Sequence, residues 1–270
     1  MKQSVTIDLQ SKVALVTGAS RGIGRAIALE LAAMGCDLML AARDTAALEE
    51  VAAAARGRGR KAAILAADLT APEASAGLAA AVEREFGRLD VFVGSAGAVG
   101  RGDFLQQSDA EWKAGFELKF FVHVRLARLL WPLLSKAGGS VVMIAGIGAR
   151  APVGDYAIGA AVIGAQLAFM KALADIGKRD GVQVNAVNPG SVATDRLHRR
   201  MKIIEERTGL DAEAAREHHR QELDITRFGE PADIAGLVGF ILSPRGRWLH
   251  GAAIDMDGGQ IVPLRMSRYD

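Results

Sequence analysis

The chain is poor in cysteine and has almost no excess of charge. Cys36 is the one cysteine among 270 residues, so no disulfide can form within the chain, and a reducing compartment is favoured. The sequence carries 33 basic and 31 acidic residues, a formal net charge of +2. This near balance gives no argument for a nucleic-acid or membrane partner, because such binding relies on a marked excess of positive charge.

Long apolar runs, internal repeats and low-complexity linkers are also missing. We find no apolar run long enough to span a bilayer, and residues 1–10 include Asp8 and lack the apolar core of a signal peptide. Half of the residues (50%) are hydrophobic, and a chain of this length can bury one large core. We therefore expect a soluble, cytoplasmic protein with a single domain over residues 1–270.

Short apolar runs alternate with longer helical patterns along the chain. Such alternation is typical of a doubly wound α/β fold of the Rossmann type, in which helices cover both faces of a parallel sheet. The seven expected strands are Val13–Val16, Leu38–Ala42, Ala62–Ala66, Leu89–Val93, Ser140–Ile144, Val182–Val187 and Ala252–Ile254. The expected helices are a segment that ends at Met34, Thr45–Ala55, Ala74–Phe86, Trp112–Trp131, Tyr156–Gly177 and Pro231–Leu242.

The first strand is joined to the first helix by a turn with three glycines, Gly18, Gly22 and Gly24. Residues without a Cβ let backbone N–H groups approach a pyrophosphate and let the helix pack closely on the strand. The turn therefore predicts a dinucleotide-binding site, although its spacing, Gly-x-x-x-Gly-x-Gly, differs from the commonest pattern, Gly-x-Gly-x-x-Gly.

Small or polar residues stand at the ends of the other expected strands. Ligands of doubly wound sheets bind beyond the carboxyl ends of the strands, so one continuous cleft would explain them all. These ends read Thr17-Gly18, Ala42-Arg43, Asp68-Leu69, Gly94-Ser95-Ala96-Gly97, Ala145-Gly146 and Asn188-Pro189-Gly190.

A set of motifs follows in a fixed order along the chain: Thr17–Gly24, Gly94–Gly97, Tyr156, Pro189–Thr194 and Asp257–Gly259. In this order and spacing, the chain resembles the classical short-chain dehydrogenase/reductase family over essentially its whole length. The resemblance implies that the glycine turn holds a pyrophosphate, that Asp68 and Leu69 lie near adenine, and that the segment from Pro189 lies along the nicotinamide. The cofactor-binding residues implied in this way are Gly18, Ser20, Arg21, Gly22, Ile23, Gly24, Arg43, Asp68, Leu69, Ser95, Ala96, Gly97, Pro189, Gly190, Val192 and Thr194.

The end of the second strand bears on the choice of cofactor. An acidic residue there would accept the ribose hydroxyls of NAD and repel a 2′-phosphate, whereas this chain has Ala42 followed by Arg43. A second guanidinium, that of Arg21, comes from the glycine turn, and two guanidiniums suit a phosphate dianion. We therefore expect NADP(H) rather than NAD(H). The alternative is that Arg43 is merely exposed and pairs with Asp44 or a glutamate.

The catalytic pattern of the family is incomplete. Its tyrosine is followed one helical turn later by a lysine, but Tyr156 is followed there by Ala160. The segment 143–150, where the family has a serine, contains no hydroxyl, and Lys119 stands where the family has an asparagine. In the family, the tyrosine exchanges a proton with the substrate oxygen, and the lysine supports it electrostatically. Ketone reduction should survive these losses better than alcohol oxidation, because a protonated tyrosine can still donate.

Lys119 offers a replacement for the missing cation. With His123 it lies on the side of its helix opposite the polar sector, among Trp112, Phe116 and other apolar residues. Our hypothesis is that the Lys119 ammonium reaches the cleft and supports Tyr156 as a second catalytic residue. The alternative, which we weight equally, is that Lys119 extends outward along a subunit interface. His123 is better explained as a packing histidine.

Residues 191–228 correspond to the substrate lid of the resembled family. This segment is rich in arginine and histidine, which could favour an anionic substrate, but glutamates interleave at helical spacing and indicate a solvated helical hairpin. We expect no metal site, because the adjacent His218 and His219 would point apart on a helix.

Together these observations predict an NADP(H)-dependent oxidoreductase that reduces a carbonyl, or oxidises a secondary alcohol, of a small organic substrate, with Tyr156 as the proton donor. Two alternatives stay open: a lyase, dehydratase or retro-aldol enzyme that uses Tyr156 and Lys119 as acid and base, and a cofactor-binding protein without turnover. The resemblance and the apolar surface of the helix Trp112–Trp131 indicate a homo-oligomer, a tetramer or a dimer.

Overall fold

A computed structural model describes residues 9–260, in which the predicted parallel sheet is confirmed. All neighbouring strands run parallel, in the order β3-β2-β1-β4-β5-β6-β7. The two ends of the predicted domain, residues 1–8 and 261–270, lie outside the described residues. The strands are β1 Val13–Thr17, β2 Asp37–Ala42, β3 Ala62–Ala66, β4 Val91–Gly94, β5 Ser140–Ile144, β6 Gln183–Pro189 and β7 Ala253–Met256.

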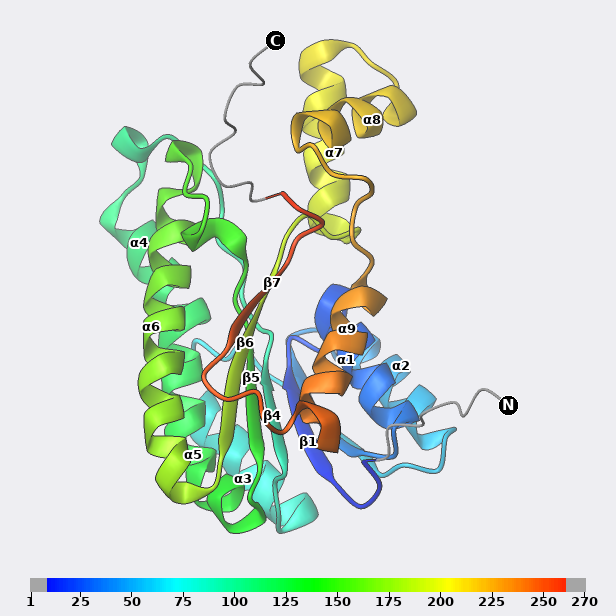
Figure 1. Cartoon of the computed structure of the whole chain (residues 1–270), viewed down its shortest axis with the longest axis vertical. Helices are drawn as coiled ribbons and strands as arrows, with labels where there is room; N and C mark the ends of the chain where they lie inside the picture. The colour runs from blue at the N-terminus through cyan, green and yellow to red at the C-terminus, as the bar shows by residue number, and fades with distance from the viewer. Residues whose placement is uncertain (1–8, 261–270) are drawn as a thin grey trace.

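Helices cover both faces of this sheet (Figure 1). On one face lie α1 (Gly22–Ala33), α2 (Thr45–Arg56) and α9 (Pro231–Leu242); on the other lie α3 (Ala74–Phe86), α4 (Asp109–Phe116), α5 (Val122–Ala137) and α6 (Ala157–Asp180). Each layer has its own apolar cluster, because alternate strand side chains point to opposite faces. In β1, Val16 packs with the α1 side and Leu15 with the α3 side.

The expected helix Trp112–Trp131 is not one regular helix. It begins earlier, at Asp109, where Ser108 and Glu111 form a capping box, and it ends at Ala137, followed by Gly138 in the left-handed conformation. Between α4 and α5, the five residues Glu117–Phe121 form a π-helical segment, η2. A π turn accommodates one extra residue without breaking the helix, so the spacing of apolar residues does not reveal it.

Helix α6 starts one residue after Tyr156, not at Tyr156 as expected. With the short turn before it, the helix covers Gly154–Asp180, 27 residues in which an 18-residue window has a mean hydropathy of 1.7, so it is long and apolar enough to cross a membrane by length and composition alone. On these two measures, our expectation that no apolar run reaches that length is wrong. In the structure, α6 packs against β6 and buries Met170, Leu173 and Ala174 in the core.

A helical hairpin projects beyond the carboxyl end of the sheet (Figure 1). It consists of α7 (Asp195–Thr208) and α8 (Ala212–Glu222), as the interleaved charges predicted. The two helices share a small apolar cluster that includes Leu197, Met201 and Ala215. Because this cluster is separate from the two clusters that flank the sheet, the hairpin is a distinct unit placed over the strand ends.

Candidate active site

The glycine turn and the motif after β4 are held together by Thr17. Its hydroxyl oxygen accepts the backbone N–H groups of Ser95 and Ala96, both at 3.1 Å, and donates to the Val93 carbonyl at 3.4 Å. A Cβ on Gly18 would lie 3.0 Å from backbone atoms of Ala96, and Gly18 has a φ of +69°. Glycine is therefore required at this close approach, and the structure brings the two predicted cofactor segments into contact.

The amino end of α1 has the geometry of an anion cradle. Helix α1 begins at Gly22, and its N-cap residue, Arg21, makes no side-chain hydrogen bond to the first turn. A Cβ on Gly24 would overlap the Gly18 carbonyl oxygen, and one on Gly22 would lie 3.3 Å from the Thr194 methyl group. Free backbone N–H groups at a helix amino end, approached by glycines, fit a pyrophosphate. Thr194, predicted to line the cofactor, lies opposite this cradle.

At the expected adenine end, Asp68 is held by the residue two positions on. It accepts the Thr70 backbone N–H at 3.0 Å and the Thr70 hydroxyl at 2.8 Å. These hydrogen bonds, with a smaller contribution from the charge of Arg43, hold the pKa of the Asp68 carboxyl below its usual range. Leu69, beside it, is buried.

Arg21 and Arg43 follow the neighbouring strands β1 and β2, and their partners differ. Arg21 lies 3.5 Å from the Asp195 carboxylate at the start of α7. Arg43 is exposed and makes no ion pair within residues 9–260, and Asp44, the partner we considered for it, instead caps α2 through the Ala47 N–H. The guanidinium of Arg43 is therefore available at the end of β2.

The segment expected along the nicotinamide is anchored at several points. Asn188 donates to Asp255 on β7 at 2.7 Å, and a Cβ on Gly190 would lie 2.7 Å from the Cα of Asp257. Val192 is buried and forms a bridge to Gly229. Residues from Pro189 to Thr194 therefore lie at the carboxyl end of β6, on one side of the predicted cleft.

Tyr156 is buried, with 7% of its surface exposed, and lies across the start of α6. A Cβ on Gly159 would fall closer than 3.0 Å to the ring atoms Cζ, Cε1 and Cε2 of Tyr156, and a Cβ on Gly148 would lie 2.9 Å from Cε1. The ring therefore occupies the space that a side chain at position 159 would fill. Sequence analysis assigned no role to Gly159, although a glycine in the first turn of a helix is a signal that could have been used.

Two arginines lie over the Tyr156 ring. The Arg101 guanidinium carbon lies 5.0 Å from the ring centroid, and that of Arg196 lies 5.2 Å from it. Arg101, from the segment after β4, also binds Asp155 at 2.6 Å. Arg196, from the first turn of α7, donates to the Val99 carbonyl at 3.4 Å. Sequence analysis missed this role of both arginines, because no local pattern places either of them beside the tyrosine.

Lys119 lies within the π-helical segment and is buried, with 8% of its surface exposed. Its Nζ donates to the Ile144 carbonyl at 3.4 Å, at the carboxyl end of β5. A Cβ on Gly97 would lie 3.0 Å from Lys119 Cγ. Burial, and secondarily the charge of Arg196, lowers the pKa of Lys119 to about 8. The side chain therefore runs inward to the carboxyl end of β5, at the floor of the predicted cleft, rather than outward to solvent.

His123 is buried one turn after Lys119. Its Nδ1 donates to the Lys119 carbonyl at 2.8 Å, and Nε2 has no hydrogen-bond partner within the described residues. Burial lowers its pKa to about 4, so His123 is a neutral packing residue at ordinary pH. In the hairpin, His218 and His219 both face Glu222, and no group of three potential metal ligands gathers among residues 9–260.

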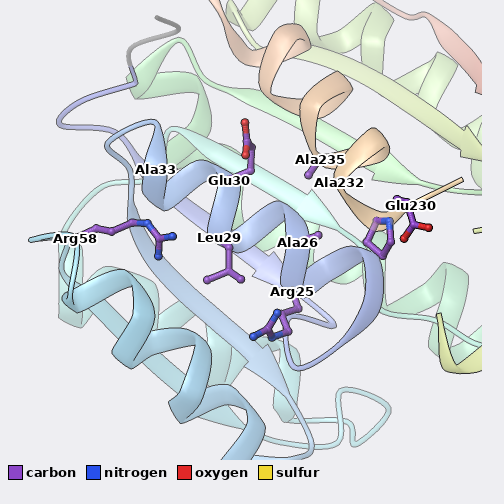
Figure 2. A pocket seen from close by; sticks show the side chains of 10 residues that line it. Arg25, Ala26, Leu29, Glu30, Ala33, Arg58, Glu230, Ala232 and Ala235 are labelled. Atoms are coloured by element: carbon purple, nitrogen blue, oxygen red, sulfur yellow. The ribbon is translucent and has the colours of Figure 1, made fainter. Parts of the chain in front are cut away.

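A hollow of about 400 Å³ lies away from these residues, between α1 and α9 (Figure 2). Its polar lining residues are Arg25, Glu30, Arg58 and Glu230. It lies alongside the helices rather than at the strand ends, and it contains none of the predicted site residues. The candidate site is therefore the region bounded by the glycine turn, Tyr156 and α7 at the carboxyl ends of the strands, where the sequence predicts a cleft.

Comparisons with known proteins agree with this geometry. Residues 18–260 match a family model described as enoyl-(acyl carrier protein) reductase. The chain is 34% identical over 258 residues to an uncharacterized oxidoreductase of Mycobacterium tuberculosis, covering 94% of each chain. It is 32% identical to the 3-oxoacyl-(acyl-carrier-protein) reductase of Pseudomonas aeruginosa, covering 95% of this chain and 100% of that protein. The crystal structure of L-sorbose reductase from Gluconobacter frateurii, complexed with NADPH and L-sorbose, superposes with a TM-score of 0.91 at 30% identity, covering 96% and 100% of the two chains.

Proposed function

The chain belongs to the short-chain dehydrogenase/reductase family, and from this we propose that it reduces the carbonyl group of a small organic molecule with NADPH. Reductases recur among its relatives, and L-sorbose reductase and the actinorhodin polyketide ketoreductase were both solved with NADPH. One observation carries the proposal on this chain itself. A buried tyrosine and a buried lysine lie at the carboxyl edge of the sheet, beside a glycine cradle that fits a pyrophosphate.

The cradle residues bind and orient the cofactor. Backbone N–H groups of the turn from Gly18 to Gly24 would hold the pyrophosphate, and residues 189–194 would lie along the nicotinamide. When bound, the reduced nicotinamide supplies the hydride that adds to the carbonyl carbon. Arg43, exposed at the end of β2 and without an ion-pair partner in the described part of the chain, favours the 2′-phosphate of NADPH over the free hydroxyl of NADH.

Tyr156 is the proton donor in this proposal. A positioned acid that protonates the carbonyl oxygen as negative charge develops on it contributes on the order of 10²- to 10⁴-fold to the rate. The ammonium of Lys119 is the residue we assign to stabilise the charge that Tyr156 acquires when it gives up its proton. Arg196 links the two groups, because it lies over the Tyr156 ring and its charge acts on Lys119.

The test is NADPH binding by fluorescence titration, followed by absorbance of the reduced nicotinamide with a panel of ketones and aldehydes. We expect substrate-dependent oxidation of NADPH, lost at least 100-fold in Tyr156→Phe, with NADPH affinity and melting temperature unchanged. Tight binding without oxidation by any carbonyl would instead favour a non-redox enzyme or a protein without turnover. Unchanged turnover in Tyr156→Phe would remove the assigned proton donor.

The cellular location and the oligomeric state of the protein are proposals as well. We place the protein in the cytoplasm as a soluble homo-oligomer, a dimer or tetramer. The support is an exposed apolar surface on the helix that carries Lys119, where Phe121 is 45% and Leu129 is 41% exposed. Light scattering coupled to gel filtration measures the assembly, and Leu129→Asp should shift it toward the monomer.

A further inference from the structure

Positive charge gathers around the tyrosine at the centre of the candidate site. The guanidiniums of Arg101 and Arg196 lie 5.0 and 5.2 Å from its ring centroid, and Lys119 is buried in the adjoining floor. The three cations come from three different segments: the loop after β4, the start of α7 and the π-helical turn. Their convergence is therefore a product of the tertiary fold and is not the solvated face of one basic helix.

These cations are poorly neutralised within the protein. Asp155 is the one carboxylate bonded to any of them among residues 9–260, and it pairs with Arg101. Arg196 and Lys119 each reach only a backbone carbonyl, at 3.4 Å. Mutual repulsion of the remaining charges is felt at Lys119, whose proton affinity falls partly because of Arg196. Lys119 is buried, whereas Arg101 and Arg196 are exposed and open to a ligand, and like charges gathered in this way favour an anion as the ligand.

We propose that the substrate carries an anionic group, a carboxylate, that binds between Arg101 and Arg196 while its carbonyl faces Tyr156. This inference rests on the carbonyl reduction proposed above and names its substrate class as short oxo acids. Guanidiniums suit this role because each presents a planar set of donors that matches the two oxygens of a carboxylate. The exposed ion pair of Arg101 with Asp155 contributes little stability, so Arg101 can share its donors with the ligand.

Binding of the anion would also fix the hairpin over the cleft. Arg196 is the second residue of α7, and its present contact across the cleft is the long one to Val99. A carboxylate held by Arg101 and Arg196 together would join α7 to the loop after β4. The same group would thereby position the carbonyl beside Tyr156 and exclude water from the reacting atoms.

The test compares oxo acids with their neutral esters. The substrates are 2-oxopentanoate and 4-oxopentanoate, each beside its methyl ester, with Arg196→Met as the variant. Arg199→Met is the matched control, because Arg199 is exposed on the same helix and makes no hydrogen bond or ion pair within the described residues. We expect the wild type to prefer at least one acid over its ester. Arg196→Met should raise KM for that acid roughly ten- to hundredfold relative to KM for its ester, whereas Arg199→Met should leave both KM values unchanged.

A binding measurement separates this inference from the proposed reduction. Calorimetric titration of the same two acids into the protein saturated with NADP⁺ reports the anion site without turnover. Binding that is lost in Arg196→Met but kept in Arg199→Met upholds the anion site even if no carbonyl is reduced. Reduction of the esters without preference for the acids, or no binding of either acid at millimolar concentration, overturns the anion site while leaving the reductase intact. An equal loss for acid and ester in Arg196→Met also overturns it, because Arg196 would then merely hold the lid.

Discussion

A methyl group added at Gly159 tests whether the seat of the Tyr156 ring is catalytic. The new Cβ would fall closer than 3.0 Å to three ring atoms, whereas ordinary contact begins at 3.4 Å. The helix backbone is fixed by its hydrogen bonds, so the ring is the part that gives way. A displacement of roughly 1 Å for a reacting group costs on the order of 100-fold in rate, about 2.7 kcal/mol of transition-state stabilisation. We therefore expect Gly159→Ala to lower kcat/KM for carbonyl reduction by about that factor.

The unfolding free energy of Gly159→Ala should stay nearly unchanged or rise, although its activity falls. Alanine is better than glycine in a helix by up to about 1 kcal/mol, which offsets the strain of moving one ring. Gly164→Ala is the matched control on the same helix, because its nearest neighbour, the Ala149 methyl carbon, would lie 4.0 Å away. Steady-state kinetics and thermal melting of both variants, with NADPH titration as a check on the cofactor site, measure the two effects separately.

The reasoning fails if Gly159→Ala keeps wild-type kcat/KM while Tyr156→Phe abolishes turnover. The tyrosine would then react from a position that the added methyl group does not affect. A fall in kcat/KM of similar size in Gly164→Ala would also contradict the argument, because it would show a general response of α6 to alanine.

Three further predictions concern buried or isolated polar groups. Lys119→Met should raise the unfolding free energy in urea at neutral pH by on the order of 1–4 kcal/mol. In the wild type, stability should rise from about pH 8 to 10.5, because the folded protein then binds fewer protons than the unfolded chain, and Lys119→Met should remove this rise. The same variant should lose activity, whereas the exposed Lys113→Met should change neither stability nor activity. Arg43→Leu should weaken NADPH binding roughly tenfold with NADH binding unaffected, and a parallel loss for both cofactors in fluorescence titration would argue against a 2′-phosphate contact. Burial raises the pKa of the Cys36 thiol to about 12, so iodoacetamide at mildly alkaline pH should alkylate it in urea but not in the native protein, as followed by mass spectrometry.

The sequence was sufficient for the sheet, because each strand is a short apolar run bounded by turns. Seven expected elements agree with the structure to within one residue at each end: Val13–Val16, Leu38–Ala42, Thr45–Ala55, Ala62–Ala66, Ala74–Phe86, Ser140–Ile144 and Pro231–Leu242. Family motifs assigned the glycine turn and the segment at Thr194 to one cofactor site, and the two lie close together, because a Cβ on Gly22 would lie 3.3 Å from the Thr194 methyl group.

The residues that surround Tyr156 could not be predicted from local sequence patterns. Helical periodicity assumed that Tyr156 and Ala160 share a helix, whereas Tyr156 precedes α6 and covers Gly159. The cations that surround the ring come from segments up to 95 residues apart (Arg101 and Arg196), and no local pattern encodes that meeting. Lys119 was found from its position in a motif, but its inward direction depends on the π turn, which apolar spacing does not show.

Because of that π turn, the number of residues between α4 and α5 determines where Lys119 lies in the candidate site. A regular α-helix advances about 100° per residue. One extra residue between α4 and α5 therefore rotates the side chains of α5 by about that angle relative to those of α4. Deleting Leu118 would let the two helices fuse smoothly, since no proline or glycine interrupts Glu117–Phe121, yet the fused helix could not keep both Trp112 and Leu126 in their present packing. Such a deletion would keep every charged residue of the site in the sequence, yet it would move the buried Lys119 amine away from the carboxyl end of β5. The placement of Lys119 is therefore encoded by a count of residues as much as by their kinds.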